Sequence, residues 1–351
     1  AALAVLELSR RRARARRAAR GPARVVELRI HPVKSAGACL VDRAEVTRFG
    51  LRHDRAFAIV DEQSNEIQTQ RKTAKMAILK PKLTEKELIL TAPGMSELAV
   101  PLHSHKLERC TARKIGSVEL DLVCWKYGAE ASEWLNRALD RTSLHLVRVE
   151  PSHAVPSTHP NSDQAGPRLL REQLAGEAAG ANDACAIHDW APFLLANTES
   201  LADLNCRLGR KKAVGIDRFR ANVVFEGGDL RPYEEDRWTV VSAGAARFRC
   251  LESCVRCTVP SIDQETGTRP DGQNPTELLR SYRTQSEDAC GPYAKFGPVF
   301  GAWAVPDFVG EDEANGSVVL RVGDLLTVEG TAAVSSYDHW ARKRPEARPG
   351  R

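Results

Sequence analysis

The sequence predicts a mixed α/β fold that is rich in β-barrel structure and has few, short helices. Apolar and polar residues alternate over short stretches, as at 25–30 and 119–124, which is typical of strands with one buried face. Gly, Pro and Asn clusters interrupt these stretches at short intervals, as turns do. Helical periodicity is confined to a few short segments. Together these patterns favour small strands wound into barrels over a helical bundle.

The first half of the chain, residues 25–150, consists mainly of expected strands. Strand-like runs occupy 25–30, 56–60, 88–91 and 119–124. The exception is 129–139, where Ala131, Trp134, Leu135 and Ala138 fall on one face of a helix. We expect a first β-barrel domain here.

Residues 151–185 have a different composition, with repeated Pro, Ser, Gly and Ala and little apolar content. This predicts a connector between domains. Order resumes over 186–330, which we expect to form a second β-barrel domain. Its helices are predicted at 200–208, with Thr198 as the capping residue, and at 275–282. Its last strands are predicted at 317–328, turning at Gly323, and residues 331–351 form a polar basic tail.

Positive charge is concentrated at the N-terminus. Residues 1–24 carry eight arginines and one acid, a local charge of +7, so the rest of the +5 chain sums to −2. Such a segment is typical of a mitochondrial presequence, of the flank of a lost or truncated membrane anchor, or of a disordered arm. Aromatic residues do not interleave with these arginines, so we expect no nucleic-acid binding.

The nine cysteines are odd in number and follow no visible secretory signal, which argues against a disulfide framework. Cys254 and Cys257 form a CxxC motif. The motif fits half of a zinc site, a redox pair or two structural thiols. A zinc site would require further ligands at comparable spacing. A thioredoxin-like redox pair would precede a helix, whereas this motif follows a predicted strand. The motif alone leaves these interpretations open.

Several blocks resemble, in the same order, the MOSC-domain proteins, and most closely the mitochondrial amidoxime-reducing components. The resemblance extends from about residue 25 to 330. Blocks in a fixed order are far more specific than any single motif. The matching blocks are 31–37, 50–57, 192–195, 200–205, 218–224, 254–258, 278–283 and 296–301.

The resemblance implies a molybdenum ion held by molybdopterin, with Cys257 as the protein thiolate ligand. A soft thiolate suits a metal that already carries sulfur ligands, and Arg256 next to it would favour the thiolate form. The pterin phosphate needs fixed positive charge and hydrogen-bond donors. The cofactor contacts implied by the matching blocks are Lys34, Ser35, Arg55, Arg220, Asn222, Val255 and Arg256.

Two positions of the predicted site depart from the family pattern. Trp190 and Ala191 stand where relatives have small hydroxyl residues, and Trp303 stands where relatives have Tyr. We still assign these three residues to the cofactor site, with an altered pocket. His188 and Asp189 suggest acid–base chemistry, but a structurally paired histidine explains them at least as well.

The resemblance implies reduction of N-hydroxylated compounds, such as amidoximes and hydroxylamines, to amines. Electrons must then come from outside, because the sequence holds no dinucleotide fingerprint and no iron–sulfur cysteine cluster. The family implies cytochrome b5 and NADH-cytochrome b5 reductase as donors and a location on the cytosolic side of the mitochondrial outer membrane. The sequence does not fix the oligomeric state, and a monomer is the default expectation. The alternative is a molybdopterin carrier or sulfur-transfer accessory without reductase turnover. A scaffold that has lost the metal is a third hypothesis.

Overall fold

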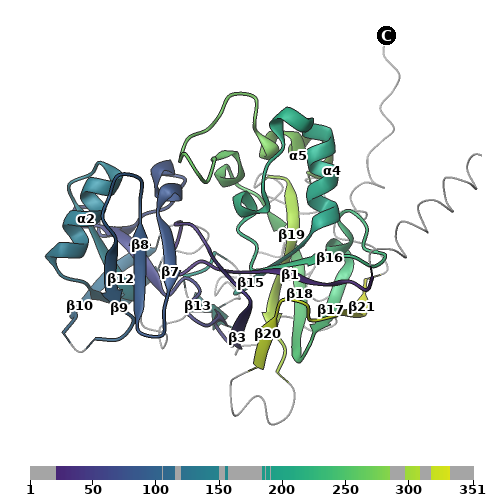
Figure 1. The fold of residues 1–351 in the computed structure, drawn as a ribbon, viewed down its shortest axis with the longest axis horizontal. Helices are drawn as coiled ribbons and strands as arrows, with labels where there is room; N and C mark the ends of the chain where they lie inside the picture. Colours follow the sequence, from purple (N-terminus) through teal and green to yellow (C-terminus); the bar gives the residue numbers. More distant parts are fainter. Residues whose placement is uncertain are drawn as a thin grey trace, which may run out of the picture.

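The structure is a computed structural model that describes residues 21–104, 106–114, 120–149, 155–156, 184–185, 187–189, 191–284, 297–308 and 318–332. Most of the predicted connector, the basic N-terminal segment and the tail therefore lie outside the described residues. Within the described ranges three α-helices accompany many short strands, which confirms the mixed, β-barrel-rich fold (Figure 1). None of the described helices has the length and apolar character needed to cross a membrane.

The N-terminal lobe contains a closed barrel of five strands. Its order is β10 (Glu108–Lys114), β11 (Leu120–Lys126), β12 (Leu144–Val149), β5 (Phe57–Asp61) and β6 (Glu66–Ile67). The barrel closes where β6 pairs in parallel with β10 at Arg113 and Glu66. Alternate residues point inward, so Ala58 and Val60 of β5 meet Val147 and Val149 of β12 in the interior.

A second group of elements covers the outside of this barrel. The meander β7 (Lys80–Leu83), β8 (Glu87–Thr91) and β9 (Leu98–Pro101) and helix α2 (Ala129–Leu139) share one core with the outer face of β5. As predicted, Ala131, Trp134, Leu135 and Ala138 are the buried face of α2. The short 3-10 helix η1 (Ala74–Ile78) contributes Met76.

The C-terminal lobe is built on an eight-stranded sheet. Its order is β2 (Cys39–Val41), β1 (Arg24–Ile30), β16 (Val223–Glu226), β15 (Phe193–Asn197), β19 (Val299–Pro306), β18 (Ala246–Val255), β17 (Trp238–Ala243) and β21 (Leu326–Thr331). The pair β15–β16 is parallel and the others are antiparallel. Backbone bonds from Val25 N to Asp324 O (2.9 Å) and from Leu326 N to Ala23 O (2.8 Å) join the start of β1 to the start of β21. Because β1 is next to one edge strand and β21 is the other edge strand, the sheet curls back on itself.

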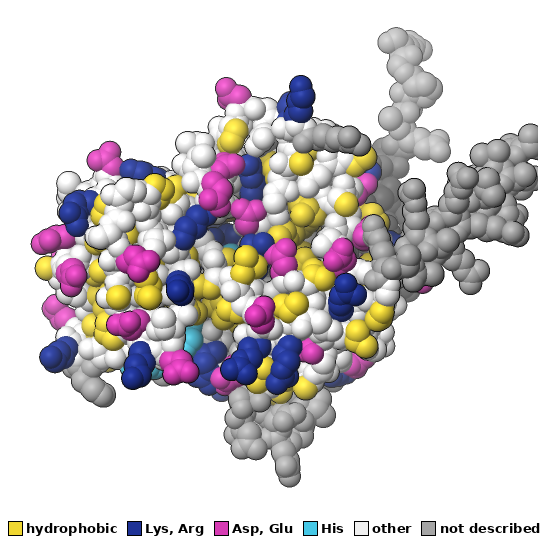
Figure 2. All heavy atoms as spheres, in the orientation of Figure 1, with side chains coloured by type: hydrophobic (Ala, Val, Ile, Leu, Met, Phe, Trp, Pro, Cys, Tyr) yellow, Lys and Arg dark blue, Asp and Glu magenta, His cyan; other side chains and the backbone are white. Residues whose placement is uncertain are grey.

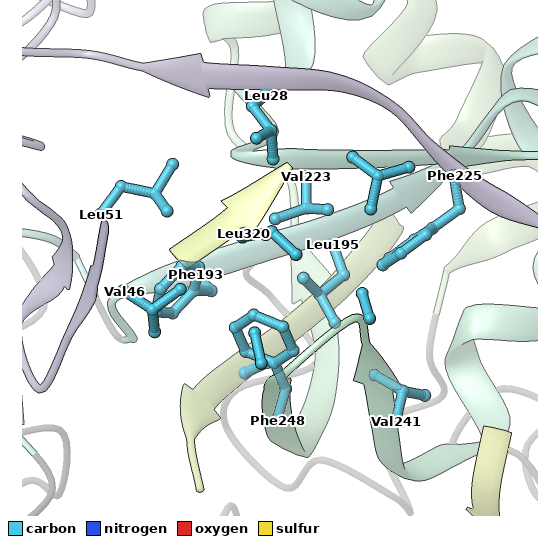
Figure 3. Packing of buried hydrophobic residues seen from close by; sticks show 14 of the residues in the cluster. Leu28, Val46, Leu51, Phe193, Leu195, Val223, Phe225, Val241, Phe248 and Leu320 are labelled. Atoms are coloured by element: carbon cyan, nitrogen blue, oxygen red, sulfur yellow. The ribbon is translucent and has the colours of Figure 1, made fainter. Parts of the chain in front are cut away.

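The inner face of this sheet forms the largest core of the C-terminal lobe (Figure 3). Phe193 and Phe248 meet there edge to face, with ring centroids 4.9 Å apart. Helices α4 (Thr198–Leu208) and α5 (Pro275–Arg283) pack on the outer face, with Leu204 and Leu279 buried (Figure 1). The cap of α4 is Asn197, whose Oδ1 accepts from Ser200 N at 2.9 Å, so the prediction of Thr198 was wrong by one residue.

Short elements complete the lobe and connect the two halves of the chain. The strand β3 (Arg43–Thr47) pairs with β4 (Gly50–Leu51) and with β20 (Val318–Arg321). The predicted turn at Gly323 exists, but β20 and β21 do not form a hairpin, because β20 pairs with β3 and β21 with β17. The remaining elements are β13 (Val155–Pro156), β14 (Ala184–Cys185), η3 (Arg210–Lys212), η4 (Ile216–Phe219), η5 (Glu234–Arg237) and η6 (Val259–Ser261).

The first four strands therefore do not belong to the N-terminal barrel. Strands β1 to β4 come from the range that we assigned to the first domain, yet they pair with strands of the second half. Alternation of apolar residues locates a strand but does not say which partner it takes. The C-terminal lobe is consequently built from both ends of the described chain, and main-chain bonds such as Phe57 N to Pro32 O (2.9 Å) connect the loop after β1 to the N-terminal barrel.

We expect the aromatic pair in the inner core to dominate the stability of the C-terminal lobe. Truncating buried Phe248 to Ala leaves a cavity beside Phe193 and should lower the free energy of unfolding by about 3–5 kcal/mol. Leu40 is 65% exposed, so Leu40→Ala is the matched control and should change it by less than about 0.5 kcal/mol. Urea unfolding followed by circular dichroism measures both, and equal losses would contradict the assignment of the core.

Candidate functional site

The candidate site begins in the loop between β1 and β2, which leaves the C-terminal sheet, contacts the N-terminal lobe and returns. Its backbone is fixed by bonds from Lys34 N to Phe57 O (2.8 Å) and from Gly37 N to Leu79 O (2.9 Å). Ser35 has a left-handed backbone with φ of 66°. Lys and Arg side chains gather around a hollow between the two lobes (Figure 2).

A buried carboxylate, Asp54, lies at the centre of the site and accepts four hydrogen bonds. Its Oδ1 accepts from the backbone N of His31 at 2.6 Å. Its Oδ2 accepts from Asn222 Nδ2 at 3.0 Å, from His188 Nε2 at 2.8 Å and from the Arg55 guanidinium. Three segments far from Asp54 in the sequence, at 31, 188 and 222, are thus tied to one side chain.

The charge on Asp54 is stabilised where it lies. Burial raises the pKa of this carboxyl, but the Arg55 guanidinium and the hydrogen bond from His188 outweigh burial and hold the pKa well below its usual range. Burial lowers the pKa of His188 to about 4, against the opposite effect of Asp54. We therefore assign a neutral His188 that donates Nε2–H to an ionised Asp54.

Three predicted cofactor residues surround this carboxylate. Arg55 Nη1 also donates to Asn222 Oδ1 at 3.1 Å, and its Nη2 reaches the backbone O of Arg220 at 3.4 Å. Asn222 is fixed further by bonds to Arg29 O (3.2 Å) and from Leu194 N (3.2 Å). Arg55 and Arg220 both have left-handed backbones, with φ of 49° and 58°. Such strain costs about 1–2 kcal/mol per residue and is typical of functional sites.

Arg220 is a buried cation close to a second one, Arg55. Burial and the charge of Arg55 lower its pKa to about 9, against the opposing effects of Asp54 and Asp189. Its Nη1 donates to Ala36 O at 2.5 Å, whereas its buried Nη2 has no hydrogen-bond partner among the described residues. A buried donor left in this way costs free energy unless a ligand accepts from it. The site is therefore prepared for an anion.

Lys34 is oriented by the segment at 187–189. Its Nζ donates to Ile187 O at 2.7 Å and to Asp189 Oδ1 at 2.9 Å. The adjacent His188 binds Asp54, so this short segment contacts two parts of the site. Gln70 Nε2 donates to Ser35 O at 2.9 Å and fixes the loop from the opposite side.

The CxxC motif lies at the end of β18, and its two thiols have different surroundings. Cys254 is buried in the core beneath α4 and α5, and burial raises its pKa to about 11. Cys257 is only half-buried, and its backbone O accepts from Thr276 Oγ1 at 3.0 Å. No cluster of three or more His, Cys, Asp or Glu side chains suited to a metal occurs in the described ranges.

Arg256 points toward the buried thiol of the pair. Its Nη1 donates to Cys254 Sγ at 2.9 Å and its Nη2 donates to Phe219 O at 2.7 Å, so these bonds do not go to Cys257 as we expected. The buried Nε has no partner among the described residues. Gly297 allows this arrangement, because it has a φ of 118° and a Cβ there would lie 2.6 Å from Arg256 O.

The remaining predicted residues lie near the same strands. Val255 is half-buried at the end of β18, opposite Val299. Ala191 is fully buried and packs with partly buried Trp303 of β19. Trp190 lies outside the described residues.

The family of the chain follows from comparison with known proteins. A model of the MOSC N-terminal beta barrel domain matches residues 22–142, and a model of the MOSC domain matches residues 182–327. Mitochondrial amidoxime reducing component 2 of Bos taurus is 32% identical over 307 residues, which cover 86% of this chain and 81% of that protein. The chain belongs to the MOSC-domain family that includes the mitochondrial amidoxime-reducing components.

Other members of this MOSC family differ in how much of their length the chain covers. Mitochondrial amidoxime-reducing component 1 of Mus musculus is 29% identical over 334 residues, covering 94% of this chain and 89% of that protein. Human molybdenum cofactor sulfurase is 28% identical over 261 residues, covering 71% of this chain and 28% of that protein. The predicted family is therefore confirmed.

The MOSC site contains residues that sequence reasoning missed. His31 and Asp54 lie in the matching blocks 31–37 and 50–57, but the sequence pattern predicted no role for either. Burial and the charges of Arg220 and Arg55 hold the pKa of His31 well below its usual range, and its ring nitrogens have no partner in the described part of the chain. The available signal was the position of Asp54 beside Arg55, since a buried arginine usually has a carboxylate partner.

We expect Asp54 to be essential for the stability of the site. Asp54→Asn keeps the shape but removes the charge that balances Arg55, so the free energy of unfolding should fall by about 3–5 kcal/mol. Asp203→Asn is the control, because Asp203 forms a more exposed i,i+4 ion pair with Arg207 and should cost about 0.5 kcal/mol. Urea unfolding distinguishes the two, and similar losses would show that Asp54 is not a structural centre.

We also expect stability to fall as pH falls from about 6.5 to about 4. In the unfolded chain His188 takes up a proton below its ordinary pKa of 6.5, whereas in the folded protein it stays neutral down to about pH 4. The unfolded state therefore binds more protons than the folded state in this pH window, so the free energy of unfolding decreases as the pH falls. The depressed pKa of Asp54 means that its own contribution is lost only below about pH 4.

The measurement is urea unfolding at pH 7 and at pH 4.5. His188→Gln removes the titrating group and keeps a donor near Asp54. The free energy of unfolding of this variant should change less between the two pH values than that of the parent protein. The two changes should differ by an amount on the order of 3 kcal/mol at most. An unchanged pH dependence in this variant would show that His188 titrates normally.

Proposed function

We propose that this protein is a molybdenum-cofactor enzyme that reduces N-hydroxylated compounds, such as amidoximes and hydroxylamines, to amines. The observation that carries the proposal is the cationic site around Arg220, which lies next to the chain segment that holds a half-buried thiol. The names of the relatives support the same chemistry. Substrate N–O cleavage consumes two electrons and two protons and yields the amine and water.

The residues fit an anionic, sulfur-ligated cofactor. The buried Nη2 of Arg220 and Nε of Arg256 lack partners among the described residues, so both can donate to a ligand. Phosphate oxygens are strong acceptors for arginine. Cys257 has a free thiol and is partly accessible, as a metal ligand must be. An anion with a soft metal satisfies both parts of the site.

Each part of the chain then has a role of its own. Lys34, Arg55 and Arg220 supply positive charge, and Asn222 fixes the position of Arg55. Ser35, Val255, Ala191, Trp190 and Trp303 belong to the proposed walls of the site. Cys257 supplies the thiolate ligand. When bound, the molybdenum–pterin group supplies two-electron redox chemistry, and the protein orients it and limits access.

The proposal includes an external source of electrons. We infer that cytochrome b5, reduced by NADH-cytochrome b5 reductase, supplies them to a monomeric enzyme. We also propose a location on the cytosolic side of the mitochondrial outer membrane. The naming of relatives as mitochondrial and the arginine-rich residues 1–24 support this placement.

A molybdopterin carrier or sulfur-transfer accessory is the alternative function, favoured by the match to molybdenum cofactor sulfurase. Two measurements on the purified chain separate the hypotheses. Molybdenum together with conversion of benzamidoxime to benzamidine supports the reductase. Molybdenum without turnover supports the carrier, and absence of molybdenum after expression in a cofactor-producing host contradicts both.

We expect Cys257 to determine metal retention. Cys257→Ala should abolish amidoxime reduction and reduce bound molybdenum, because the thiolate ligand is lost. Cys254→Ala is the matched control. It should lower stability through loss of buried packing but keep the metal. Molybdenum is measured by mass spectrometry of the metal, and full activity of Cys257→Ala would refute the ligand assignment.

A further inference from the structure

Two cysteines face each other across neighbouring strands of the N-terminal barrel. Cys110 on β10 and Cys124 on β11 are direct partners in the antiparallel register. Side chains of directly opposed residues lie on the same face of a sheet. Cys124 is fully buried among the residues that fill the barrel, and Cys110 packs against the same cluster. Both thiols are free.

The backbone pattern shows which kind of pair they form. Arg113 N donates to Asn65 O at 2.7 Å, away from β11, and Tyr127 N donates to Leu146 O at 3.0 Å on β12. Backbone groups of successive strand residues alternate in direction. The backbone groups of Cys110 and Cys124 therefore point toward each other's strand, as in a hydrogen-bonded pair. The Cα atoms of such a pair are about 5.5 Å apart.

This spacing is compatible with a disulfide. Bridged cysteines have Cα atoms about 4.4–6.8 Å apart and Cβ atoms about 3.5–4.5 Å apart. Directly opposed strand residues have Cβ atoms about 4.5–5.5 Å apart, so the strands must approach slightly for the bridge to form. A bridge formed in this way stores strain and is easily reduced.

We propose that Cys110 and Cys124 form a redox modification site, a dithiol that peroxide converts reversibly to a cross-strand disulfide. The Cys110 thiol attacks one peroxide oxygen and becomes a sulfenic acid with release of water. The Cys124 thiol then attacks the sulfenic sulfur, and the second water leaves as the S–S bond forms. Two thiols are oxidised by two electrons, and one hydrogen peroxide is reduced to two waters.

The surroundings of the two thiols set the order of these steps. Cys110 is partly exposed, so oxidant reaches it first, whereas Cys124 is enclosed in the barrel. Burial raises the pKa of both thiols, that of Cys124 to about 12, so both are weak nucleophiles. The direct opposition of the two residues compensates, because the second step is intramolecular. We therefore expect oxidation to be slow and selective.

Peptide mapping of the full chain tests the site. After treatment with hydrogen peroxide and alkylation of remaining thiols, mass spectrometry without reduction should detect a cross-linked peptide joining residues 110 and 124. Dithiothreitol should reverse it, and its yield should not depend on protein concentration. Oxidation that leaves Cys124 alkylatable, or that joins Cys110 to another cysteine, would overturn the proposal.

Two variants make the test specific. Cys110→Ser should abolish the cross-link at little cost to folding, because Cys110 is only partly buried. Cys206→Ser is the matched control, since Cys206 is exposed and lies on α4, and it should form the 110–124 bridge as the parent does. Equal loss of the free Cys124 thiol on oxidation of the parent and of Cys110→Ser would contradict the assignment, because Cys124 would then react without Cys110. None of these outcomes depends on the cofactor.

Discussion

The buried carboxylate of Asp54 is the interaction on which the rest of the site depends. It lies where the loop after β1, the turn after β4, the start of β16 and the segment at 187–189 meet. A buried charge without partners is prohibitively unfavourable, so the fold must bring these donors together to keep Asp54 ionised. In return the carboxylate fixes Arg55 and Asn222, and through them the backbone of Arg220. One desolvated charge thereby organises segments from both lobes.

The site combines one fully hydrogen-bonded side chain with two side chains that are not. Asp54 has its hydrogen bonds filled, whereas Arg220 and Arg256 keep buried N–H groups without acceptors in the described part of the chain. Left-handed backbones at Ser35, Arg55 and Arg220 store strain in the same place. Because these donors are already fixed, a bound anion loses little free energy to reorganisation. The geometry suits an anion held by donors that are already in place.

Local sequence patterns predicted local structure well. Short runs followed by turn residues located β5 and β8, and alternation located β11. The helical spacing of four apolar residues predicted α2 and its buried face. Ordered blocks predicted the MOSC family and placed Lys34, Arg55, Arg220 and Asn222 in one region. The side-chain roles of these residues in cofactor binding stay a prediction.

Long-range pairing and side-chain direction were not predictable from the sequence. Nothing in the alternation of β1 indicates that its neighbours are β2 and β16, because period and register do not encode the partner. Arg256 follows Cys254 and precedes Cys257, and only the packing beside Phe219 turns its guanidinium toward the buried thiol. The opposition of Cys110 and Cys124 likewise depends on hairpin register, which spacing alone leaves open.

The pairing of the first strands with the last has a consequence for biosynthesis. β1 can pair with β2 and β3 with β4 as soon as they are made, but β3 also pairs with β20 and the start of β1 bonds to the turn around Asp324, so these further partners are missing until residues 318–324 have been made. At about 5–20 residues per second, translation of the intervening chain takes on the order of tens of seconds. During that interval their apolar faces are exposed on the ribosome. The barrel formed by β5, β6 and β10 to β12 can close earlier. Chaperone protection is therefore most important for the short strands β1 to β4, which are synthesised first.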